Sequence, residues 1–325
     1  MNKILVTGGN GFIGSMVCKS LYDSGYEVDS LDNLDLSFPR KHTIEKNIKI
    51  IKCDLTDRKR LKEILQKNKY DGVFHLAGLI SVSDSNKQQS NYFKNNVLAS
   101  LNLILTMIET DTNNLIFSSS ASVYQSKSSK IIETDFLNPI SVYAQNKFVV
   151  ENFLKSMFEI YNFKSITLRY FNACGADFES LIGFTLSKET HLIPLAISAT
   201  LSNNIFNLYG NNYDTKDGTC MRDYVHIKDI AEAHIEAFEG LRSNKINYDV
   251  FNIGTGKGYT VLEIIEKIQI ATNRNLNYII SDRREGDASC LVADVNKFSK
   301  TFDWKATKTL NDIIKDSIFY YKKVY

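Results

Sequence analysis

The stretch KILVTGGNGFIG, residues 3–14, passes from an apolar run through a glycine-rich turn into a segment with helical spacing. Gly8 can make a tight turn, Gly11 lets the backbone approach a pyrophosphate, and Gly14 lets helix and strand pack closely. The start of the helix would offer free N–H groups to the phosphates. This pattern predicts a dinucleotide-binding turn between the first strand and the first helix.

The rest of the chain continues this alternation of strand and helix. Short strands that alternate with longer helices predict an α/β fold, a Rossmann-type doubly wound parallel sheet with right-handed crossovers. Strands are expected at 27–31, 48–53, 72–76, 115–117, 165–169 and 250–253. Helices are expected at about 58–67, 92–108, 142–158 and 229–241.

The alternation breaks after Asn172. Residues 173–221 are rich in Gly, Asn, Asp and Thr and lack long periodic segments, so we interpret them as an insertion. A chain of 325 residues suggests about two domains. We predict that 1–172 plus 222–255 form the dinucleotide-binding domain. Residues 173–221 plus 256–325 would form a smaller mixed α/β lobe that binds the substrate.

The composition excludes several classes of protein. Lys and Arg number 39 against 37 Asp and Glu, and this balance gives no sign of a nucleic-acid or membrane-surface partner. No apolar run approaches the ~18 residues of a membrane span, and the N-terminal one is too short for a signal peptide. The cysteines form no C-x-x-C pair, so we expect free buried thiols, no metal site and a cytoplasmic protein. They are Cys18, Cys53, Cys174, Cys220 and Cys290.

An acidic residue follows the second expected strand. Asp32 lies eighteen residues beyond Gly14, close to the spacing of about 20 for a ribose-binding acid. A carboxylate there accepts hydrogen bonds from the ribose hydroxyls and repels a 2′-phosphate, which favours NAD over NADP. Arg40 and Lys41 lie further along the chain and do not replace this acid.

Candidate catalytic residues follow the fifth expected strand. Ser118–Ser120 close that strand, at the sheet edge where ligands of such folds bind. Tyr143 and Lys147 are four residues apart, on one face of an expected helix. A nearby ammonium and a positive nicotinamide would lower the pKa of the tyrosine. Tyr143 as base, Lys147 on the ribose and Ser120 on the reacting oxygen predict hydride and proton transfer at a secondary alcohol.

Motifs along nearly the whole chain are similar to those of the extended short-chain dehydrogenase/reductase family, and within it to the UDP-glucose 4-epimerases. In chain order they are TGGNGFIG at 7–14, LDNL at 31–34, CDLTD at 53–57, HLAG at 75–78, NNV at 95–97, SSSASVY at 118–124, YAQNK at 143–147, RYFN at 169–172, ETHLIPL at 189–195, DGTCMRDYVHIKDIAEAH at 217–234 and RREGD at 283–287.

The resemblance implies epimerisation of a UDP-sugar with tightly bound NAD. Tyr143 would take the proton of the sugar 4-hydroxyl while C4 transfers hydride to NAD, and the 4-keto sugar would turn over and regain the hydride on its other face. The residues implied to contact NAD are Gly8, Gly11, Phe12, Ile13, Gly14, Asp32, Asn33, Asp54, Leu55, Leu76, Ala77, Gly78, Asn95, Ser118, Tyr143, Lys147 and Tyr170. Those implied to contact the UDP-sugar are Ser120, Tyr143, Asn172, Arg222, Arg284 and Asp287.

Other activities on the same fold are weighed against this one. Dehydratases and decarboxylases of the family carry a carboxylate just after the strand-five hydroxyl, where this chain has Ala121 and Ser122. Leu291 stands where the family admits or excludes an N-acetyl group, and its bulk favours plain UDP-glucose and UDP-galactose. A 4-epimerase of UDP-N-acetylglucosamine or UDP-xylose stays open, as does a non-catalytic NAD-sensing protein.

The resemblance also implies a homodimer, with segments 91–108 and 143–158 as a plausible interface. We expect His75 and His226, which lie within motifs, to be structural, and propose no metal ligand among these residues and His191.

Overall fold

The computed structural model describes residues 2–35, 47–184, 191–284 and 287–324. Arg40 and Lys41, like parts of the ETHLIPL and RREGD motifs, lie outside these residues. Within the described ranges, seven parallel strands form the large sheet in the order β10-β6-β5-β4-β1-β2-β3. Their bounds are β1 Lys3–Thr7, β2 Glu27–Asp32, β3 Lys49–Lys52, β4 Gly72–His75, β5 Leu115–Ser120, β6 Ser165–Tyr170 and β10 Tyr248–Ile253. Strands β1 to β6 have the spatial order 3-2-1-4-5-6 of a doubly wound sheet, which confirms the predicted fold.

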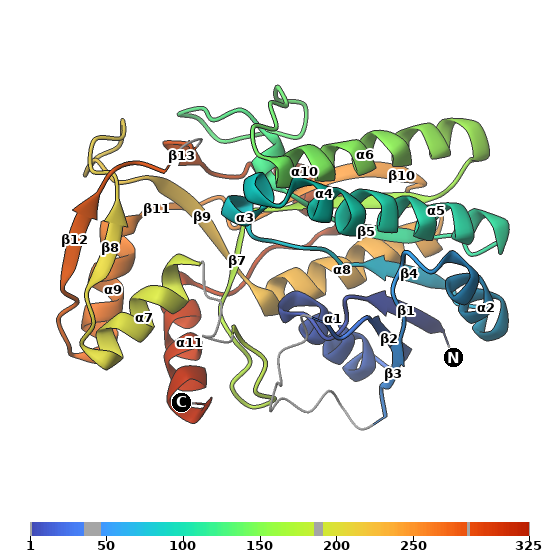
Figure 1. Cartoon of the computed structure of the whole chain (residues 1–325), viewed down its shortest axis with the longest axis horizontal. Helices are drawn as coiled ribbons and strands as arrows, with labels where there is room; N and C mark the ends of the chain where they lie inside the picture. Colours follow the sequence, from blue (N-terminus) through green and yellow to red (C-terminus); the bar gives the residue numbers. More distant parts are fainter. Residues whose placement is uncertain (1, 36–46, 185–190, 285–286, 325) are drawn as a thin grey trace.

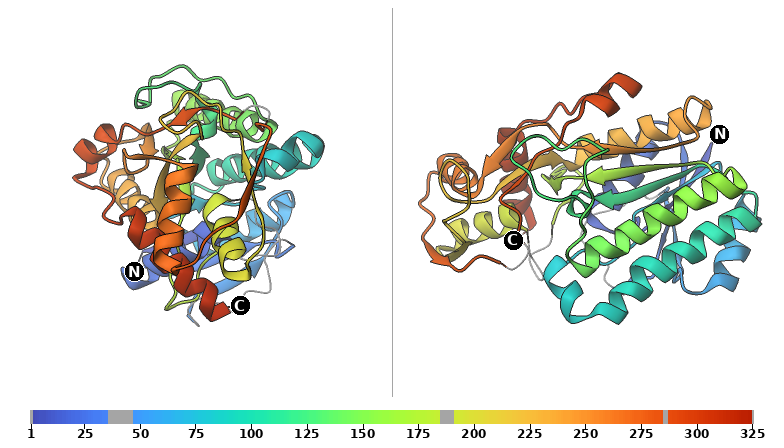
Figure 2. Two further views of the ribbon diagram at one scale, coloured as in Figure 1. Left: turned by 90° about the vertical axis from the view of Figure 1, so that its left-hand side faces the viewer. Right: turned by 90° about the horizontal axis from the view of Figure 1, so that it is seen from above.

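Helices cover both faces of this sheet (Figure 1). One face carries α2 (Arg58–Asn68), α5 (Ala99–Glu109) and α6 (Val142–Tyr161). The other carries α1 (Phe12–Asp23), α8 (Ile227–Arg242) and α10 (Asn296–Phe302). Seen from above, α5 and α6 run side by side (Figure 2).

The first strand shows why the sheet is buried on both faces. Ile4 and Val6 pack into the cluster beneath α1 and α8, whereas Leu5 packs into the cluster beneath α2, α5 and α6. All three side chains are fully buried. Alternate residues of a strand point to opposite faces, so a continuous apolar run suits a sheet that is covered twice.

The segment between β4 and β5 is helical over more of its length than we predicted. It contains α3 (Val82–Lys87), α4 (Gln89–Tyr92) and a π-helical turn, η1 (Phe93–Leu98), that runs into α5. The expected helix at 92–108 is confirmed, but its first turns are wider than those of an α-helix. Such π turns are rare and occur frequently at functional sites.

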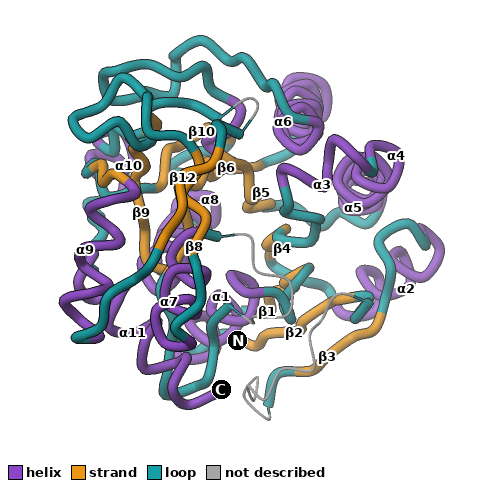
Figure 3. Tube along the Cα trace, turned by 60° about the vertical axis from the view of Figure 1, so that its left-hand side comes forward, coloured by secondary structure: helices purple, strands orange, loops and turns teal. Residues whose placement is uncertain are grey.

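A second group of elements lies beside the carboxyl ends of the large sheet (Figure 3). β9 (Met221–His226) pairs with β7 (Asn172–Cys174), β11 (Gly258–Thr260) and β13 (Cys290–Leu291), and β8 (Phe206–Tyr209) pairs with β12 (Tyr278–Ser281). The helices here are α7 (Leu192–Ser202), α9 (Val261–Thr272) and α11 (Leu310–Val324). Their apolar faces share one core around Ile197, Ile264 and Ile313.

The sequence did not lead us to expect α7. Its residues, LIPLAISATLS, are apolar on most sides, so the segment lacks the one-sided period that marks a surface helix. Within 222–255, β9 pairs in the smaller sheet, whereas α8 and β10 belong to the large layer. The division into the two predicted domains stays a prediction.

All five cysteines are buried free thiols, as expected. In the described part of the chain, no helix is long and apolar enough to span a membrane. The same residues contain no group of three or more His, Cys, Asp or Glu side chains that could hold a metal ion.

Candidate active site

The turn between β1 and α1 leaves no room for a side chain at its three motif glycines. Gly8 has φ +70°, and a Cβ there would lie 2.6 Å from the Ala77 nitrogen. A Cβ on Gly11 or Gly14 would lie 2.9 or 2.1 Å from the Gly8 carbonyl oxygen. The three glycines therefore let the turn fold on itself and against the loop after β4. This is a cradle of bare backbone, as a dinucleotide pyrophosphate requires.

The start of α1 fits an anion. Gly11 is its N-cap and, within the described residues, no side chain caps the first turn. Backbone N–H groups at a helix N-terminus lack partners inside the helix and attract negative charge. Gly11 can therefore leave this end of α1 open to a phosphate.

Asp32 ends β2 directly beside this turn. Its carboxylate accepts hydrogen bonds from the backbone N–H of Asn10 at 3.1 Å and of Leu34 at 2.9 Å. The side chain is partly exposed. The predicted ribose-binding acid thus lies next to the glycine turn, with its lone pairs only partly engaged.

Asn33 and Asp54 meet at the ends of the neighbouring strands. Burial raises the pKa of Asp54, but hydrogen bonds from the Thr56 side chain and backbone and from Asn33 outweigh it, so the pKa is lowered. Both Thr56 hydrogen bonds measure 2.7 Å. Leu55, the next residue in the chain, is buried. These three predicted cofactor residues are therefore close together in space.

The loop after β4 is held by an asparagine whose role the sequence analysis missed. Asn96 accepts from the Leu79 N–H at 2.8 Å and donates to the Leu79 carbonyl at 2.9 Å, beside Gly78. Asn95, which we predicted instead, donates to the Asn91 carbonyl at 2.9 Å. Its contact with the cofactor stays a prediction. The paired amides of NNV could have indicated that one of them is structural.

His75 is structural in this arrangement. Ser100 donates its hydroxyl to the Asn96 carbonyl at 2.6 Å, so it accepts from His75 Nε2 at 2.7 Å. Nδ1 then accepts from the Thr7 hydroxyl at 2.7 Å. Burial, with a smaller effect of Lys147, lowers the pKa of His75 to about 3, so the ring is neutral.

The start of α6 is held in place by three side chains. Ser141 caps the Ala144 N–H at 3.1 Å. Two side chains from α3 also reach the first turn: Ser85 accepts from the Tyr143 N–H at 3.1 Å, and Asn86 accepts from the Val142 N–H at 3.2 Å. Because these donors lack partners inside the helix, the contacts orient the turn that carries the tyrosine.

The predicted catalytic residues converge at the carboxyl end of β5. Lys147 is buried and donates to the Ser118 carbonyl at 2.8 Å, and its Nζ lies 5.9 Å from the centre of the Tyr143 ring. Ser120 accepts from the Ser122 N–H and hydroxyl at 3.2 and 2.9 Å. Its own proton is then free for its hydrogen bond with Tyr143. The end of one strand and one helix face thus build the site.

The pKa of Tyr143 differs from our expectation. Burial raises it to about 12, although the hydrogen bond from Ser120 acts in the opposite direction. Burial also lowers the pKa of Lys147 to about 8, and Glu151 partly offsets this. The sequence argument counted the favourable charges but not desolvation, which opposes the charged form of both groups.

Tyr170 lies in the next strand, paired with Ser120 in the β5–β6 register. His234 uses Nδ1 on the Ile230 carbonyl at 2.8 Å, so its Nε2 accepts from the Tyr170 hydroxyl at 2.5 Å. Ser118 also bonds this phenol. Tyr170 and Ser118, both predicted cofactor residues, therefore lie together beneath the catalytic group.

The other four predicted substrate residues lie on or next to the strands of the smaller sheets. Arg222 donates to Asp287 at 2.6 Å, and the Asp287 N–H donates to the Arg284 carbonyl at 3.2 Å. Arg284 stacks on Tyr209, 4.0 Å from the ring centre, a contact that the sequence did not indicate. Asn172 begins β7, opposite Tyr224 of β9. A guanidinium held by a carboxylate presents its remaining donors in a defined direction.

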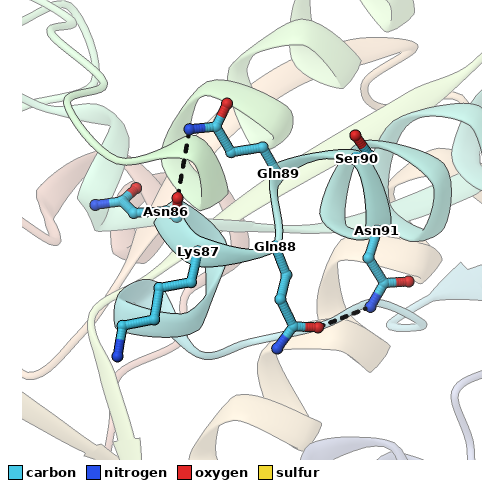
Figure 4. Close-up of a pocket in the computed structure, with 6 residues that line it drawn as sticks. All are labelled: Asn86, Lys87, Gln88, Gln89, Ser90 and Asn91. Carbon is cyan, nitrogen blue, oxygen red and sulfur yellow. Dashed lines mark hydrogen bonds between the residues drawn. The ribbon is translucent and has the colours of Figure 1, made fainter.

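A polar hollow lies on the α3–α4 connection and contains none of the predicted catalytic or substrate residues. It is lined by Asn86, Lys87, Gln88, Gln89, Ser90 and Asn91. Figure 4 shows Asn91 donating to the Gln88 side chain and Gln89 donating to the Asn86 backbone carbonyl, so part of the polar lining is bonded within the hollow itself.

The sequence model of the NAD dependent epimerase/dehydratase family matches residues 4–254. The chain belongs to this family. A relative from Rhizobium meliloti (strain 1021), named UDP-glucose 4-epimerase, is 38% identical over 94% of this chain and 92% of its own length. The resemblance seen in the motifs is therefore confirmed.

Solved structures of the NAD dependent epimerase/dehydratase family agree with this fold. A UDP-glucose 4-epimerase from Brucella ovis in complex with NAD superposes with a TM-score of 0.92 and 34% identity, and the match covers 98% of each chain. One from Bifidobacterium longum in complex with NAD+ and UDP has a TM-score of 0.92 and 32% identity over 99% of each chain.

Proposed function

We propose that this chain is an NAD-dependent UDP-glucose 4-epimerase that interconverts UDP-glucose and UDP-galactose. The observation that carries the proposal is the convergence of Ser120, Tyr143 and Lys147 at the carboxyl end of the parallel sheet. The bare glycine turn and Asp32 lie at the same edge. Relatives that match nearly the full chain carry the same name.

The residues proposed to hold NAD surround the bare backbone of the β1–α1 turn. The cradle that a Cβ would fill and the uncapped start of α1 fit a pyrophosphate, and Asp32 fits the ribose. The set is Gly8, Gly11, Phe12, Ile13, Gly14, Asp32, Asn33, Asp54, Leu55, Leu76, Ala77, Gly78, Asn95, Ser118, Tyr143, Lys147 and Tyr170. When bound, NAD supplies an acceptor for the hydride of sugar C4 and returns it.

Tyr143 is the proposed acid–base group. It takes the proton of the sugar 4-hydroxyl as the hydride departs, and returns it to the oxygen after the keto sugar has turned over. Lys147 stays protonated nearby, and its charge favours the phenolate over the phenol. Ser120 donates to the reacting oxygen or to the phenolate. Ala121 and Ser122 leave no carboxylate for elimination at this position.

The UDP-sugar is proposed to lie between the sheet edge and the smaller lobe. Asn172, Arg222, Arg284 and Asp287 would contact it there, in addition to Ser120 and Tyr143. A guanidinium fork matches two oxygens of a diphosphate, and Asp287 already holds Arg222 in one orientation. The division of the chain into a dinucleotide-binding and a substrate-binding domain is part of this proposal.

A homodimer and a cytoplasmic location complete the proposal. The predicted interface segments expose large apolar side chains: Phe93, Leu98 and Val149 are 54%, 44% and 43% exposed. Five free thiols suit a reducing compartment. Light scattering of the purified protein, which should report twice the mass of the chain, tests the dimer.

A substrate panel tests the activity. Purified protein should release NAD on denaturation and interconvert UDP-glucose and UDP-galactose. UDP-N-acetylglucosamine, UDP-xylose and UDP-glucuronate are offered in parallel, and each product is identified directly. Conversion of only one of those sugars would replace the proposed substrate, and absence of both NAD and turnover would refute the proposal.

A further inference from the structure

A buried row of polar side chains crosses three strands one residue before the catalytic row. In the register of the large sheet, Ser119 of β5 pairs with Arg169 of β6, which pairs with Asn252 of β10. All three are buried. The next residues in the register are Ser120 and Tyr170. The proposed reaction uses the second row and leaves the first without a role.

Glu151 of α6 joins this row from above the sheet. Its Oε1 accepts from Arg169 Nε at 3.1 Å and its Oε2 from Arg169 Nη2 at 2.6 Å, which makes a forked ion pair. The Ser119 hydroxyl donates to the same carboxylate. Both side chains of the ion pair are 5% exposed.

Arg169 extends the contacts to a third strand. Its Nη1 donates to the Tyr124 hydroxyl at 2.7 Å, and Tyr124 donates to Asn252 Oδ1 at 2.7 Å. Tyr124 follows the short 3₁₀ turn η2 (Ala121–Val123) that leaves the catalytic strand. The ion pair therefore fixes the strand end on both sides of Ser120.

Glu151 also shares a helix face with the catalytic pair. Tyr143, Lys147 and Glu151 follow one another at intervals of four residues, so they lie on one side of α6. Lys147 donates to the Ser118 carbonyl, and Glu151 accepts from the next residue, Ser119. Helix α6 thus forms hydrogen bonds with two consecutive residues of β5.

Stability alone does not explain this arrangement. Taking two charges out of water costs free energy, and replacing a buried ion pair with apolar residues is often neutral or stabilising. Lys147 adds a second buried cation one helical turn away. The Glu151 carboxylate attracts the Lys147 ammonium, whereas the Arg169 guanidinium repels it.

We propose that Glu151 is a positioning residue, balanced by Arg169, that holds the Lys147 ammonium and the Ser118–Ser120 strand end in the geometry that the reaction needs. It acts through Lys147 and Ser119 and does not touch the reacting atoms. The inference deepens the proposed epimerase function and rests on it.

Few other charges reach Lys147. From α6, Tyr143 and Glu151 face Lys147. From the sheet, the neutral His75 of β4 faces it, as do the Phe117 ring and the Ser118 carbonyl of β5. Tyr170 of β6 and Tyr92 of α4 adjoin Tyr143. The charged side chains of the other elements packed on α6 are exposed, namely Asp84, Lys87, Lys94 and Glu109. Glu151 is therefore the charged group that opposes the effect of burial on Lys147, and Arg169 acts on it through its ion pair with Glu151.

Two single variants give opposite expectations. Glu151→Gln removes the attractive charge, so the alkaline limb of kcat against pH should move down by about one pH unit. Arg169→Gln removes the repulsive charge, so the limb should move up by a similar amount. Ser119→Ala is the matched control, because it loses a hydrogen bond to Glu151 without changing the charge, and its limb should stay in place.

A double variant separates the proposed positioning role from a role in the stability of the fold. Glu151→Met/Arg169→Met should keep a melting temperature close to that of the wild type, since neither partner of the ion pair is left alone, but lose at least ~10-fold in kcat. Retained kcat in that variant, or a uniform loss across pH in both single variants with no opposite shift, would overturn the positioning role. Wild-type protein without epimerase activity would instead refute the proposed function.

Discussion

The ammonium of Lys147 donates a hydrogen bond to the main-chain carbonyl of Ser118 at 2.8 Å, which ties the fourth residue after the tyrosine to the end of β5. The contact joins a helix to a strand that precedes it by more than twenty residues. It places a buried cation, a phenol and a serine hydroxyl at one sheet edge, and the following expectations depend on that placement.

Tyr143→Phe should retain NAD and lose kcat by about 10²–10⁴-fold, because the ring is kept and only the proton carrier is removed. Turnover of UDP-galactose and NAD released on denaturation are measured on the same preparation. A variant with wild-type kcat would show that another group moves the proton.

The activity should fall as pH rises through about 8. The pKa of Lys147 is lowered to about 8 by burial, so its ammonium, present below that pH, is lost above it and no longer favours the Tyr143 phenolate. The kcat profile of the wild type is compared with that of Lys147→Met, which should be slow at all pH values and lack this limb. If the fall of kcat at high pH persists in Lys147→Met, that fall belongs to the titration of another group.

Asp32→Asn should weaken NAD binding by about 10-fold or more, since a charged acceptor of a ribose hydroxyl contributes about 1.5–3 kcal/mol. It should also reduce the preference over NADP, because the repulsion of a 2′-phosphate is removed. Retention of each cofactor after gel filtration is the measurement. The amide oxygen can still accept from the Leu34 N–H, but the contact with the Asn10 N–H is lost, so the melting temperature is measured on the same preparation.

Arg284→Ala should raise the KM for UDP-glucose about 10-fold, with NAD content unchanged. The adjacent Arg283→Ala is a matched control: this arginine donates to Asn212 at 2.5 Å, stacks on Tyr213 and is not in the proposed substrate set. Equal effects of the two substitutions would contradict the assignment of Arg284.

The free energy of unfolding should decrease as the pH falls below about 6.5. Burial lowers the pKa of His75 to about 3 and of His234 to about 4, so both stay neutral in the folded chain but bind protons when unfolded. The unfolded state then binds more protons, and stability declines by up to roughly 1.4 kcal/mol per pH unit for each histidine. Urea unfolding at pH 7 and pH 5 measures the slope, and His75→Asn should reduce it.

Features that depend on residues close together in the chain could be predicted from the sequence, and those that depend on distant residues could not. The sequence predicted the glycine turn, Asp32 and the Tyr143–Lys147 spacing, because each depends on residues that are close in the chain. Glu151 could have been noticed, since it continues the four-residue interval. Its partner Arg169 could not have been predicted, because the register between β5 and β6 is what brings Arg169 next to Ser119 and Glu151. The apolar α7 was missed because a helix buried on most sides has no amphipathic period.

By itself, the sequence determined the doubly wound fold and the chemical nature of the catalytic set, because strand–helix alternation and i,i+4 spacing are local properties. Only the tertiary structure decided that burial raises the pKa of Tyr143 and lowers that of Lys147, and that Arg222 meets Asp287. Desolvation and long-range pairing arise from the packing of segments far apart in the chain, so neither is present until the chain has folded.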